Sequence, residues 1–320
     1  MFRFHRKEQS ISLFGSSCPV CQERQGIDLW GAKARDHIRG HYFRIILCSN
    51  CRLGRTNPVP EPISFYYPKR YRRYKLPVNI LLNFLYRLKA QRWAKTYSKS
   101  GKVLEIGCGD GLMLQAFKQL GWTVLGVERS MQAAEIALTN NLPILTDLHQ
   151  IKQNTNKFDL IILYHSLEHL HDPVSVLRIC KSHLAVHGKI TITVPNFSSY
   201  QAILTGPHWL HLDPPRHLIH FTPLSLDYTL RQAGLQKISL RYNALVLDTY
   251  GWIESVMNCL GYSQNLFTGF LMGLRQFSFE LVFIVCIQLL LLPLAILLSC
   301  YGWLVGKGAI LEVIAVKDSD

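Results

Sequence analysis

Short apolar runs alternate along the middle of the chain with stretches in which apolar residues recur at helical spacing. The runs predict strands at 102–107, 123–128, 143–146, 158–164 and 189–195. The periodic stretches predict helices at 112–120, 130–138, 174–184 and 222–234. Mostly apolar strands that alternate with helices are typical of a parallel sheet covered on both faces. We therefore expect a doubly wound α/β domain.

Three closely spaced glycines follow the first of these strands, in V-L-E-I-G-C-G-D-G at 103–111. Glycines at the carboxyl end of a strand let the backbone turn sharply and approach a ligand. Glu128 ends the second strand, 19 residues after Gly109, and an acid there can accept both hydroxyls of a ribose. A dinucleotide fingerprint, G-x-G-x-x-G, would need glycine where this chain has Leu112. The stretch alone predicts a nucleotide-like ligand.

A family resemblance narrows the ligand. The glycine stretch, G-V-E-R-S after the second strand, and F-D-L-I-I-L-Y-H-S-L-E-H-L-H-D-P from 158 resemble class I S-adenosylmethionine-dependent methyltransferases, above all the branch of the ubiquinone-pathway O-methyltransferases. The similarity covers 101 to about 247, including W-L-H-L-D-P-P-R-H-L-I-H-F-T at 209–222. It implies a seven-stranded, mostly parallel sheet and S-adenosylmethionine as cofactor.

The same resemblance implies which residues bind the cofactor. They are Glu105, Gly107, Cys108, Gly109, Gly111, Glu128, Arg129, Asp147 and Tyr164. In this assignment Glu105, Gly107 and Gly109 line the methionine part. Glu128 takes the ribose, and Asp147 lies near the adenine.

Methyl transfer is an in-line displacement at a carbon that the sulfonium already activates, so the protein mainly positions two reactants and excludes water. A base is needed only if the acceptor must lose a proton. The candidates are His165, Glu168, His169 and His217, although each could instead make a structural hydrogen bond. His165 departs from the ubiquinone branch, where this position is commonly Glu. The spacing also matches the inverted zinc-protease motif H-x-x-E-H, but it lacks the long helix that a protease needs.

The segment 209–222 is expected to cover the acceptor. Trp209, Arg216 and His217 lie in it. Arg216 could grip a phosphate or a carboxylate, or it could brace the loop.

Four cysteines form two C-x-x-C pairs, C-P-V-C and C-S-N-C, separated by 26 residues. Each pair supplies two soft ligands from one tight turn, so Cys18, Cys21, Cys48 and Cys51 predict a four-thiolate zinc ribbon. With every position filled by protein, the zinc would be structural. A chance pairing and redox thiols are the alternatives. The sequence leaves open whether the ribbon positions a substrate or partner, or caps the domain.

Positive charge gathers ahead of the glycine stretch. The chain has 35 Lys and Arg against 21 Asp and Glu, and no acid stands between Glu61 and Glu105. Eleven basic residues fall in that interval: Lys69, Arg70, Arg72, Arg73, Lys75, Arg87, Lys89, Arg92, Lys95, Lys99 and Lys102. Part of the interval, 78–95, predicts a basic amphipathic helix. An anionic partner is therefore expected, either nucleic acid or the inner face of a membrane.

An uncharged apolar run occupies 281–306, longer than the ~20 residues that cross a bilayer. In the class I fold the last strand is antiparallel beside its predecessor, and 235–247 and 308–317 fit these two strands. Both ends of the run must then lie on one side of a membrane. Pro293 divides the run into arms of twelve residues, so we expect a re-entrant or interfacial helical hairpin. A buried helix pair, a dimer interface and a single-pass anchor with a detached tail are the alternatives.

Together these features predict a membrane-associated methyltransferase that acts on a small-molecule, lipid-linked or glycan acceptor. Its N-terminus, M-F-R-F-H-R-K-E-Q-S, lacks the apolar core of a signal peptide, so we expect the cytoplasmic face of a membrane. The expected divisions are 1–60 (ribbon and linker), 61–100 (basic segment), 101–247 (catalytic domain), 248–307 (apolar insertion) and 308–320 (last strand and tail).

Two other functions remain possible on the sequence. An RNA methyltransferase would suit the ribbon and the basic patch. Against it, base amino-methylating enzymes carry D/N-P-P-aromatic after the fourth strand, where this chain has Y-H-S-L, so nucleic acid is not the expected partner. A non-catalytic membrane adaptor with a retained nucleotide fold is the third reading.

Overall fold

The main sheet of the protein has seven strands in the order β12-β13-β10-β9-β6-β7-β8. The computed structural model describes residues 11–13, 17–68, 76–97, 100–151, 157–242, 244–262 and 265–318. The strands are β6 (Lys102–Ile106), β7 (Thr123–Val127), β8 (Ile144–Leu145), β9 (Phe158–Tyr164), β10 (Leu184–Pro195), β12 (Leu235–Arg241) and β13 (Ile310–Lys317). β13 is antiparallel to both of its neighbours, and the other described pairs are parallel. The doubly wound, mostly parallel sheet of the prediction is confirmed.

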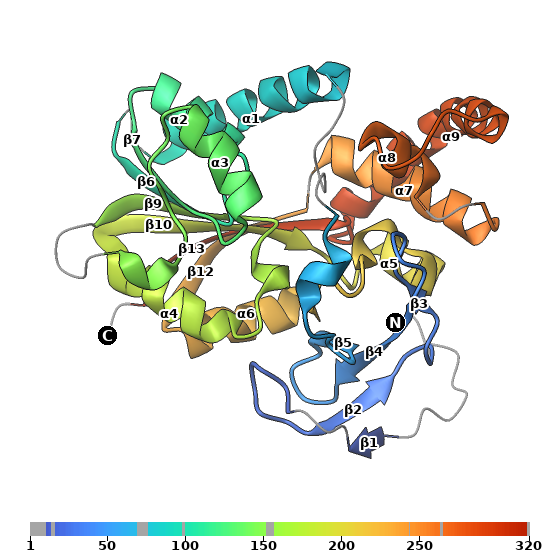
Figure 1. The fold of residues 1–320 in the computed structure, drawn as a ribbon. Coiled ribbons are helices and arrows are strands. Elements are labelled where there is room, and N and C mark those ends of the chain that lie inside the picture. The colour runs from blue at the N-terminus through green and yellow to red at the C-terminus, as the bar shows by residue number, and fades with distance from the viewer. Residues whose placement is uncertain are drawn as a thin grey trace.

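Helices cover both faces of this sheet (Figure 1). One face carries α1 (Leu76–Tyr97), α2 (Leu112–Gln119) and α3 (Met131–Thr139), and the other carries α4 (Pro173–His183) and α6 (Pro223–Gln232). Local signals fix several starts. Ser130 accepts the Ala133 N–H at the start of α3, and Thr222 caps α6 with Pro223 at its first position. The apolar residues of these helices face the sheet and form two large clusters of buried side chains.

A second, antiparallel sheet stands beside the main one, at the lower right of Figure 1. Its strands are β1 (Ile11–Leu13), β2 (Gln25–Asp28), β4 (Tyr42–Cys48), β5 (Gly54–Asn57) and β11 (Ile219–His220), with β3 (Ala34–Arg35) pairing β4. We call residues 17–57 the ribbon. Its last strand pairs with β11, which belongs to the chain after β10. The second sheet therefore contains strands of the ribbon and one short strand, β11, of the main domain.

Short helical turns connect these parts. They are η1 (Ile63–Tyr66), η2 (Leu148–Gln150), η3 (Leu167–His169), α5 (Tyr200–Thr205), η4 (Gly206–His208) and η5 (Leu210–Leu212).

Between β12 and β13 the chain forms an apolar insertion, residues 245–304. It consists of α7 (Leu245–Cys259), α8 (Leu266–Leu271) and α9 (Phe279–Leu304), and it lies at the upper right of Figure 1. The predicted strand 235–247 is too long, because β12 ends at Arg241 and α7 begins at Leu245.

The predicted helical hairpin is wrong. α9 is one helix of 26 residues with Pro293 inside it. The proline removes one backbone hydrogen bond, but buried residues on both sides of it, Ile284 before and Ser299 after, hold the helix in place. The single-pass anchor with a detached tail is also excluded, since β13 pairs with β10 and β12 only a few residues beyond the helix.

Polar side chains fix α9 to α7. The Gln288 amide donates to Glu254 Oε1 at 2.6 Å, and the Trp303 indole N–H donates to Asp248. The opposite side of α9 is apolar and exposed. Its exposed large residues are Phe279, Val282, Phe283, Leu289, Leu290, Leu292, Leu294, Ile296, Leu297, Tyr301 and Leu304. In the described part of the chain this is the one helix long and apolar enough to cross a membrane.

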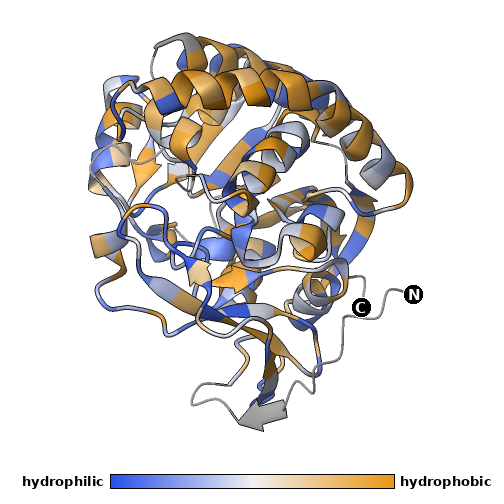
Figure 2. Ribbon diagram, turned by 90° about the vertical axis from the view of Figure 1, so that its right-hand side faces the viewer, coloured by the Kyte–Doolittle hydropathy of each residue, from blue (hydrophilic) through white to orange (hydrophobic). Residues whose placement is uncertain are grey.

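Figure 2 shows hydrophobic residues gathered on the helices at the upper side of the molecule. α1 contributes to this side as well (Figure 1). It buries Ala90, Trp93 and Ala94 and exposes Ile80, Leu81, Phe84 and Leu88. The predicted helix at 78–95 is confirmed, with an apolar face turned to the outside. Of the eleven basic residues ahead of the glycine stretch, Lys89 and Arg92 pair with Glu312 of β13. Six others lie outside the described residues: Lys69, Arg70, Arg72, Arg73, Lys75 and Lys99.

The buried acid between α7 and α9 makes a pH dependence of stability testable. Burial raises the pKa of Glu254 to about 7, although hydrogen bonds from Thr268 and Gln288 lower it in part. Because the folded pKa lies above the unfolded one, this group's favourable contribution is complete below about pH 4 and is lost as the pH rises to about 7. The free energy of unfolding of the wild type should fall by up to about 3 kcal/mol over this range because of Glu254, and we expect Glu254→Gln to lack this fall.

Thermal unfolding in detergent between pH 4 and pH 8 measures this effect, as the difference between variant and wild type. The exposed Glu280, at the start of α9, gives the control Glu280→Gln. If the stability difference between Glu254→Gln and wild type is the same at pH 4 and at pH 8, the raised pKa of Glu254 is contradicted.

Candidate functional site

The glycine stretch turns at the carboxyl end of β6, as predicted. Gly107, Gly109 and Gly111 have φ values of 73°, 56° and 80°, a region that other residues rarely adopt. A Cβ on Gly107 would lie 2.7 Å from the Ser166 Cβ, whereas one on Gly109 would meet nothing within 4 Å. The loop therefore packs tightly against the segment after β9 on one side and leaves open space at Gly109.

Glu105 lies beneath this loop and is almost wholly buried. Its Oε2 has no hydrogen-bond partner among the described residues. Burial, and then the negative charges of Asp110 and Glu128, raise its pKa well above the usual range. A buried carboxyl without a partner fits a cationic ligand, since a nearby positive charge would offset the desolvation of the carboxylate. The ammonium and sulfonium groups of S-adenosylmethionine are of this kind.

Glu128 and Asp147 follow the next two strands at the same edge. The Glu128 carboxylate accepts the N–H of Gly109 at 2.9 Å and that of Ser130 at 2.7 Å, so it is fixed directly beside the glycine loop. Asp147 is exposed and caps η2 by accepting the His149 N–H. Arg129 is exposed and Cys108 is buried. The parallel strands thus bring the predicted cofactor residues to one edge of the sheet.

Tyr164, the last residue of β9, contacts α1. Its ring meets those of Tyr86 and Trp93 edge to face, with centroids 5.7 and 6.3 Å apart. The Lys89 ammonium lies 4.9 Å from the same ring centroid and pairs with Glu312 at 2.9 Å. α1 therefore closes one side of the site, a contact that the sequence did not predict.

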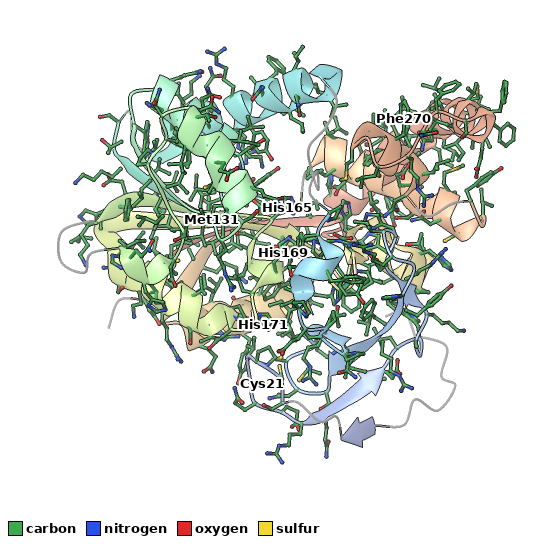
Figure 3. All side chains as sticks on the ribbon, viewed as in Figure 1. Cys21, Met131, His165, His169, His171 and Phe270 are labelled. Atoms are coloured by element: carbon green, nitrogen blue, oxygen red, sulfur yellow. The ribbon has the colours of Figure 1, made fainter. Side chains whose placement is uncertain are left out.

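The four predicted catalytic candidates come together after β9. We call His165, Glu168, His169 and His217 the histidine cluster. His165 Nδ1 lies 3.4 Å and His217 Nε2 lies 3.9 Å from Glu168 Oε1. The rings of His169 and His217 are 4.8 Å apart between centroids. Figure 3 labels His165 and His169 near the centre of the molecule.

Glu168 is ionised in this environment. Burial would raise its pKa, but the hydrogen bond from His165 and the charges of His169, His217 and His165 lower it to about 2. A buried anion of this kind attracts the N–H groups of the imidazoles around it and so orients their rings.

The same cluster has the donor atoms of a metal site. One atom each from Glu168, His169 and His217 lies within 4.8 Å of the others. Two imidazoles and a carboxylate suit divalent ions such as zinc, manganese or iron. These residues could therefore hold a cation as well as transfer a proton.

Arg216 braces the loop rather than facing an acceptor. Its buried guanidinium contacts Asp36 of the ribbon at 2.7 Å and Asp213 at 2.5 Å, and it donates to the Tyr66 carbonyl at 3.0 Å. Burial would raise the pKa of Asp213, but the charge of Arg216 and the hydrogen bond from His37 hold it well below the usual range. Of the two roles that the sequence left open for Arg216, these contacts support the one in which it braces the loop.

Trp209 is also an internal residue. It is buried in a cluster with Phe197 and Leu212, and its indole N–H donates to Gln201 Oε1 at 3.3 Å. It packs the loop against the ribbon side of the domain and does not line an open surface.

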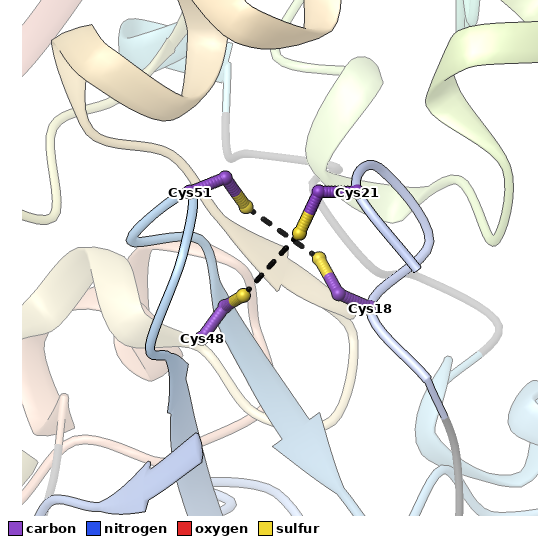
Figure 4. A group of neighbouring side chains, drawn as sticks. All are labelled: Cys18, Cys21, Cys48 and Cys51. Atoms are coloured by element: carbon purple, nitrogen blue, oxygen red, sulfur yellow. Dashed lines mark hydrogen bonds between the residues drawn. The ribbon is translucent and has the colours of Figure 1, made fainter. Parts of the chain in front are cut away.

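The four predicted zinc ligands also come together, as Figure 4 shows. The Sγ atoms of Cys18 and Cys51 are 3.6 Å apart, and those of Cys21 and Cys48 are 3.5 Å apart. Zn–S bonds of about 2.3 Å in a tetrahedron place the sulfurs about 3.8 Å apart. The four thiols therefore fit a zinc ion, which would hold the two knuckles of the ribbon together.

Sequence comparisons agree with this geometry. A family model described as a methyltransferase domain matches residues 70–240, more than half of the 320-residue chain. The ubiquinone biosynthesis O-methyltransferase of Haemophilus ducreyi is 28% identical over 177 residues, which are 49% of this chain and 75% of that protein. Its namesake from Pseudomonas aeruginosa is 29% identical over 161 residues, which are 45% and 69% of the two chains.

The chain is also similar to solved structures. One is a SAM-dependent methyltransferase from Archaeoglobus fulgidus, which is 17% identical with a TM-score of 0.47; the match covers 73% of this chain and 94% of that one. The plantazolicin methyltransferase BpumL in complex with SAH is 17% identical with a TM-score of 0.44, covering 74% and 84%. On the match over residues 70–240, this chain belongs to the methyltransferase family and is an S-adenosylmethionine-dependent enzyme.

Proposed function

We propose that this enzyme transfers a methyl group from S-adenosylmethionine to a hydroxyl group of an amphiphilic acceptor, a lipid-linked precursor or a small molecule held at the cytoplasmic face of a membrane. The observation that carries the proposal is the long exposed apolar face of α9, next to a methyltransferase domain with an intact cofactor edge. The O-methyltransferase names of the relatives support an oxygen acceptor.

In this proposal the cofactor lies along the edge formed by β6, β7 and β8. Glu105 faces its positive charges, and Gly107 and Gly109 let the backbone approach its methionine part. Glu128 holds the ribose, and Asp147 lies near the adenine. The fixed position of Glu128 and the unpartnered carboxyl of Glu105 support this arrangement.

His165 is the base of the proposed reaction. Its Nδ1 faces the Glu168 carboxylate, while its Nε2 is buried and has no hydrogen-bond partner among the described residues. The acceptor proton moves to Nε2, the acceptor oxygen forms a bond to the methyl carbon, and the carbon–sulfur bond breaks to leave S-adenosylhomocysteine. Glu168 stabilises the resulting imidazolium. The cluster around it excludes water and orients the ring.

In this proposal α9 lies parallel to the membrane surface. α9 is about 39 Å long, and its buried stripe is fixed to α7, so it cannot leave the protein to span a bilayer. α9 and α1, which both expose apolar side chains, lie on the same upper side of the molecule (Figures 1 and 2). Exposed Arg275 precedes α9, and exposed Arg87 and Lys95 lie on α1. Basic groups next to an apolar face favour anionic headgroups.

The acceptor is identified by comparing lipid and lipid-linked glycan mass profiles of source cells with and without the gene. The proposal predicts one species that is lighter by one CH2 in cells that lack the gene. Identical membrane profiles, together with such a shift in a water-soluble metabolite, would overturn the membrane acceptor.

Cofactor binding gives a direct test of the glycine edge. Gly107→Ala is expected to weaken binding of S-adenosylmethionine at least about tenfold, because its Cβ would collide with Ser166 and force the loop apart. Isothermal titration calorimetry measures the affinity. Gly121→Ala is the matched control, since Gly121 also has a positive φ but a Cβ there meets nothing within 4 Å. Equal losses in both variants would contradict the assigned site.

Vesicle flotation tests the membrane face. Leu290 and Leu297 of α9 are 80% and 67% exposed, and changing both to Asn should lower binding to phosphatidylglycerol vesicles at least about tenfold, since each buried Leu contributes about 1.5–3 kcal/mol. The control changes Leu204 and Leu224, which are 71% and 54% exposed on α5 and α6. If wild type fails to float and instead forms a dimer that the α9 variant abolishes, the face is a protein interface and the membrane proposal fails.

A further inference from the structure

Strand β5 of the ribbon is hydrogen-bonded to the backbone that carries the histidine cluster. Thr56 of β5 donates its hydroxyl proton to the His217 carbonyl at 2.6 Å, and its N–H donates to the Leu218 carbonyl at 2.9 Å. Leu218 in turn donates its N–H to the Glu168 carbonyl at 2.9 Å. Three hydrogen bonds thus connect a ribbon residue to the backbone of both His217 and Glu168.

The hydroxyl of Thr56 has a second partner. His220 Nε2 lies 3.0 Å from it. Burial lowers the pKa of His220 to about 3, so its imidazole is neutral. Because the Thr56 proton is used on the His217 carbonyl, His220 donates to the hydroxyl oxygen. Both bonds are buried, where losing a partner costs about 1–3 kcal/mol.

A second link reaches His169. The Arg216 side chain is tied to ribbon residue Asp36 and contacts His37 at 3.0 Å. The carbonyl of the same arginine accepts from His169 Nδ1 at 2.8 Å. The ribbon is therefore linked by hydrogen bonds to two of the three histidines of the cluster, His217 and His169.

The four cysteines stand directly behind this strand. Cys48 ends β4, Cys51 lies in the turn, and β5 begins at Gly54. The Cys48 N–H donates to the Leu53 carbonyl at 2.9 Å and closes the turn. Cys18, Cys48, Cys51 and Leu53 are buried in the same cluster as Leu218 of the main domain. A metal ion bound to the four sulfurs would therefore also fix the turn that leads into β5.

We propose that the ribbon is a positioning element of the catalytic centre, in which zinc at the four cysteines holds β5 so that Thr56 and Arg216 keep His217 and His169 facing Glu168. The proposal rests on the methyl-transfer function proposed above. The ribbon thus forms a wall of the active site, and Thr56 is a positioning residue without contact to cofactor or acceptor.

Substitution of Thr56 tests the proposal in the full chain. Thr56→Val keeps the shape and removes the hydroxyl. We expect incorporation of tritium from [methyl-3H]S-adenosylmethionine into membranes of source cells lacking the gene to fall at least about tenfold, with cofactor affinity unchanged within about twofold. Thr56→Ser, which keeps the hydroxyl, should restore most of the activity. Thr229→Val is the control, because that buried hydroxyl donates to a carbonyl of its own helix at 2.7 Å.

Hydrogen exchange gives a readout that needs no acceptor. After zinc is removed with a chelator and its loss is checked by atomic emission, peptides that cover 165–170 and 214–221 should exchange faster, while those that cover 103–111 stay protected. Thr56→Val should show the same pattern with zinc in place. Unchanged exchange at 165–170 and 214–221 in both samples overturns the positioning role. If wild type labels no membrane component, the acceptor proposal fails, and the exchange result still decides this one.

Discussion

The position of β13 between β10 and β12 is the constraint on which the rest of the structure depends. Six residue pairs join β13 to β10, and six join it to β12. The chain must therefore return to the sheet after the apolar insertion, at the position one strand in from its edge. A helix that ends at Leu304, a few residues before β13, cannot carry the last strand away from the domain. The apolar helix consequently lies along the protein, with its polar contacts turned to α7 and its apolar side turned out.

Two buried carboxylates in the site are stabilised in different ways. Glu168 is surrounded by imidazoles, which keep it ionised. Burial, and then the negative charges of Asp110 and Glu128, raise the pKa of Glu105 well above its usual range. The difference supports the roles proposed for them, in which Glu168 orients protein groups and Glu105 faces a cationic cofactor. Glu105 lies beneath the glycine loop, and the Glu168 carbonyl is linked to Thr56 of the ribbon through the Leu218 backbone.

Local chemistry explains what the sequence could predict. The glycine turn, the Ser130 and Thr222 caps, and the paired cysteines each act over a few residues, and all are found in the structure. The prediction of a helical hairpin at Pro293 was wrong because the packing of α9 against α7 outweighs the loss of one helical hydrogen bond. The role of Arg216 could not be read from its neighbours in sequence, since Asp36 and Tyr66 are brought to it only when the ribbon docks. Asp213, three residues before it, was the one local signal.

We propose that α9 lies in the plane of a membrane surface while the methyltransferase domain remains attached to it. Spin labels placed one at a time at Leu290, Leu297 and Leu304, all exposed along one helix, measure this directly in phosphatidylglycerol vesicles. Power saturation by oxygen and by a nickel chelate gives the depth of each label. A helix that lies in the plane of the surface should give similar, shallow depths at all three positions. A depth that changes steadily along the helix, as in a bilayer-spanning segment, would contradict it.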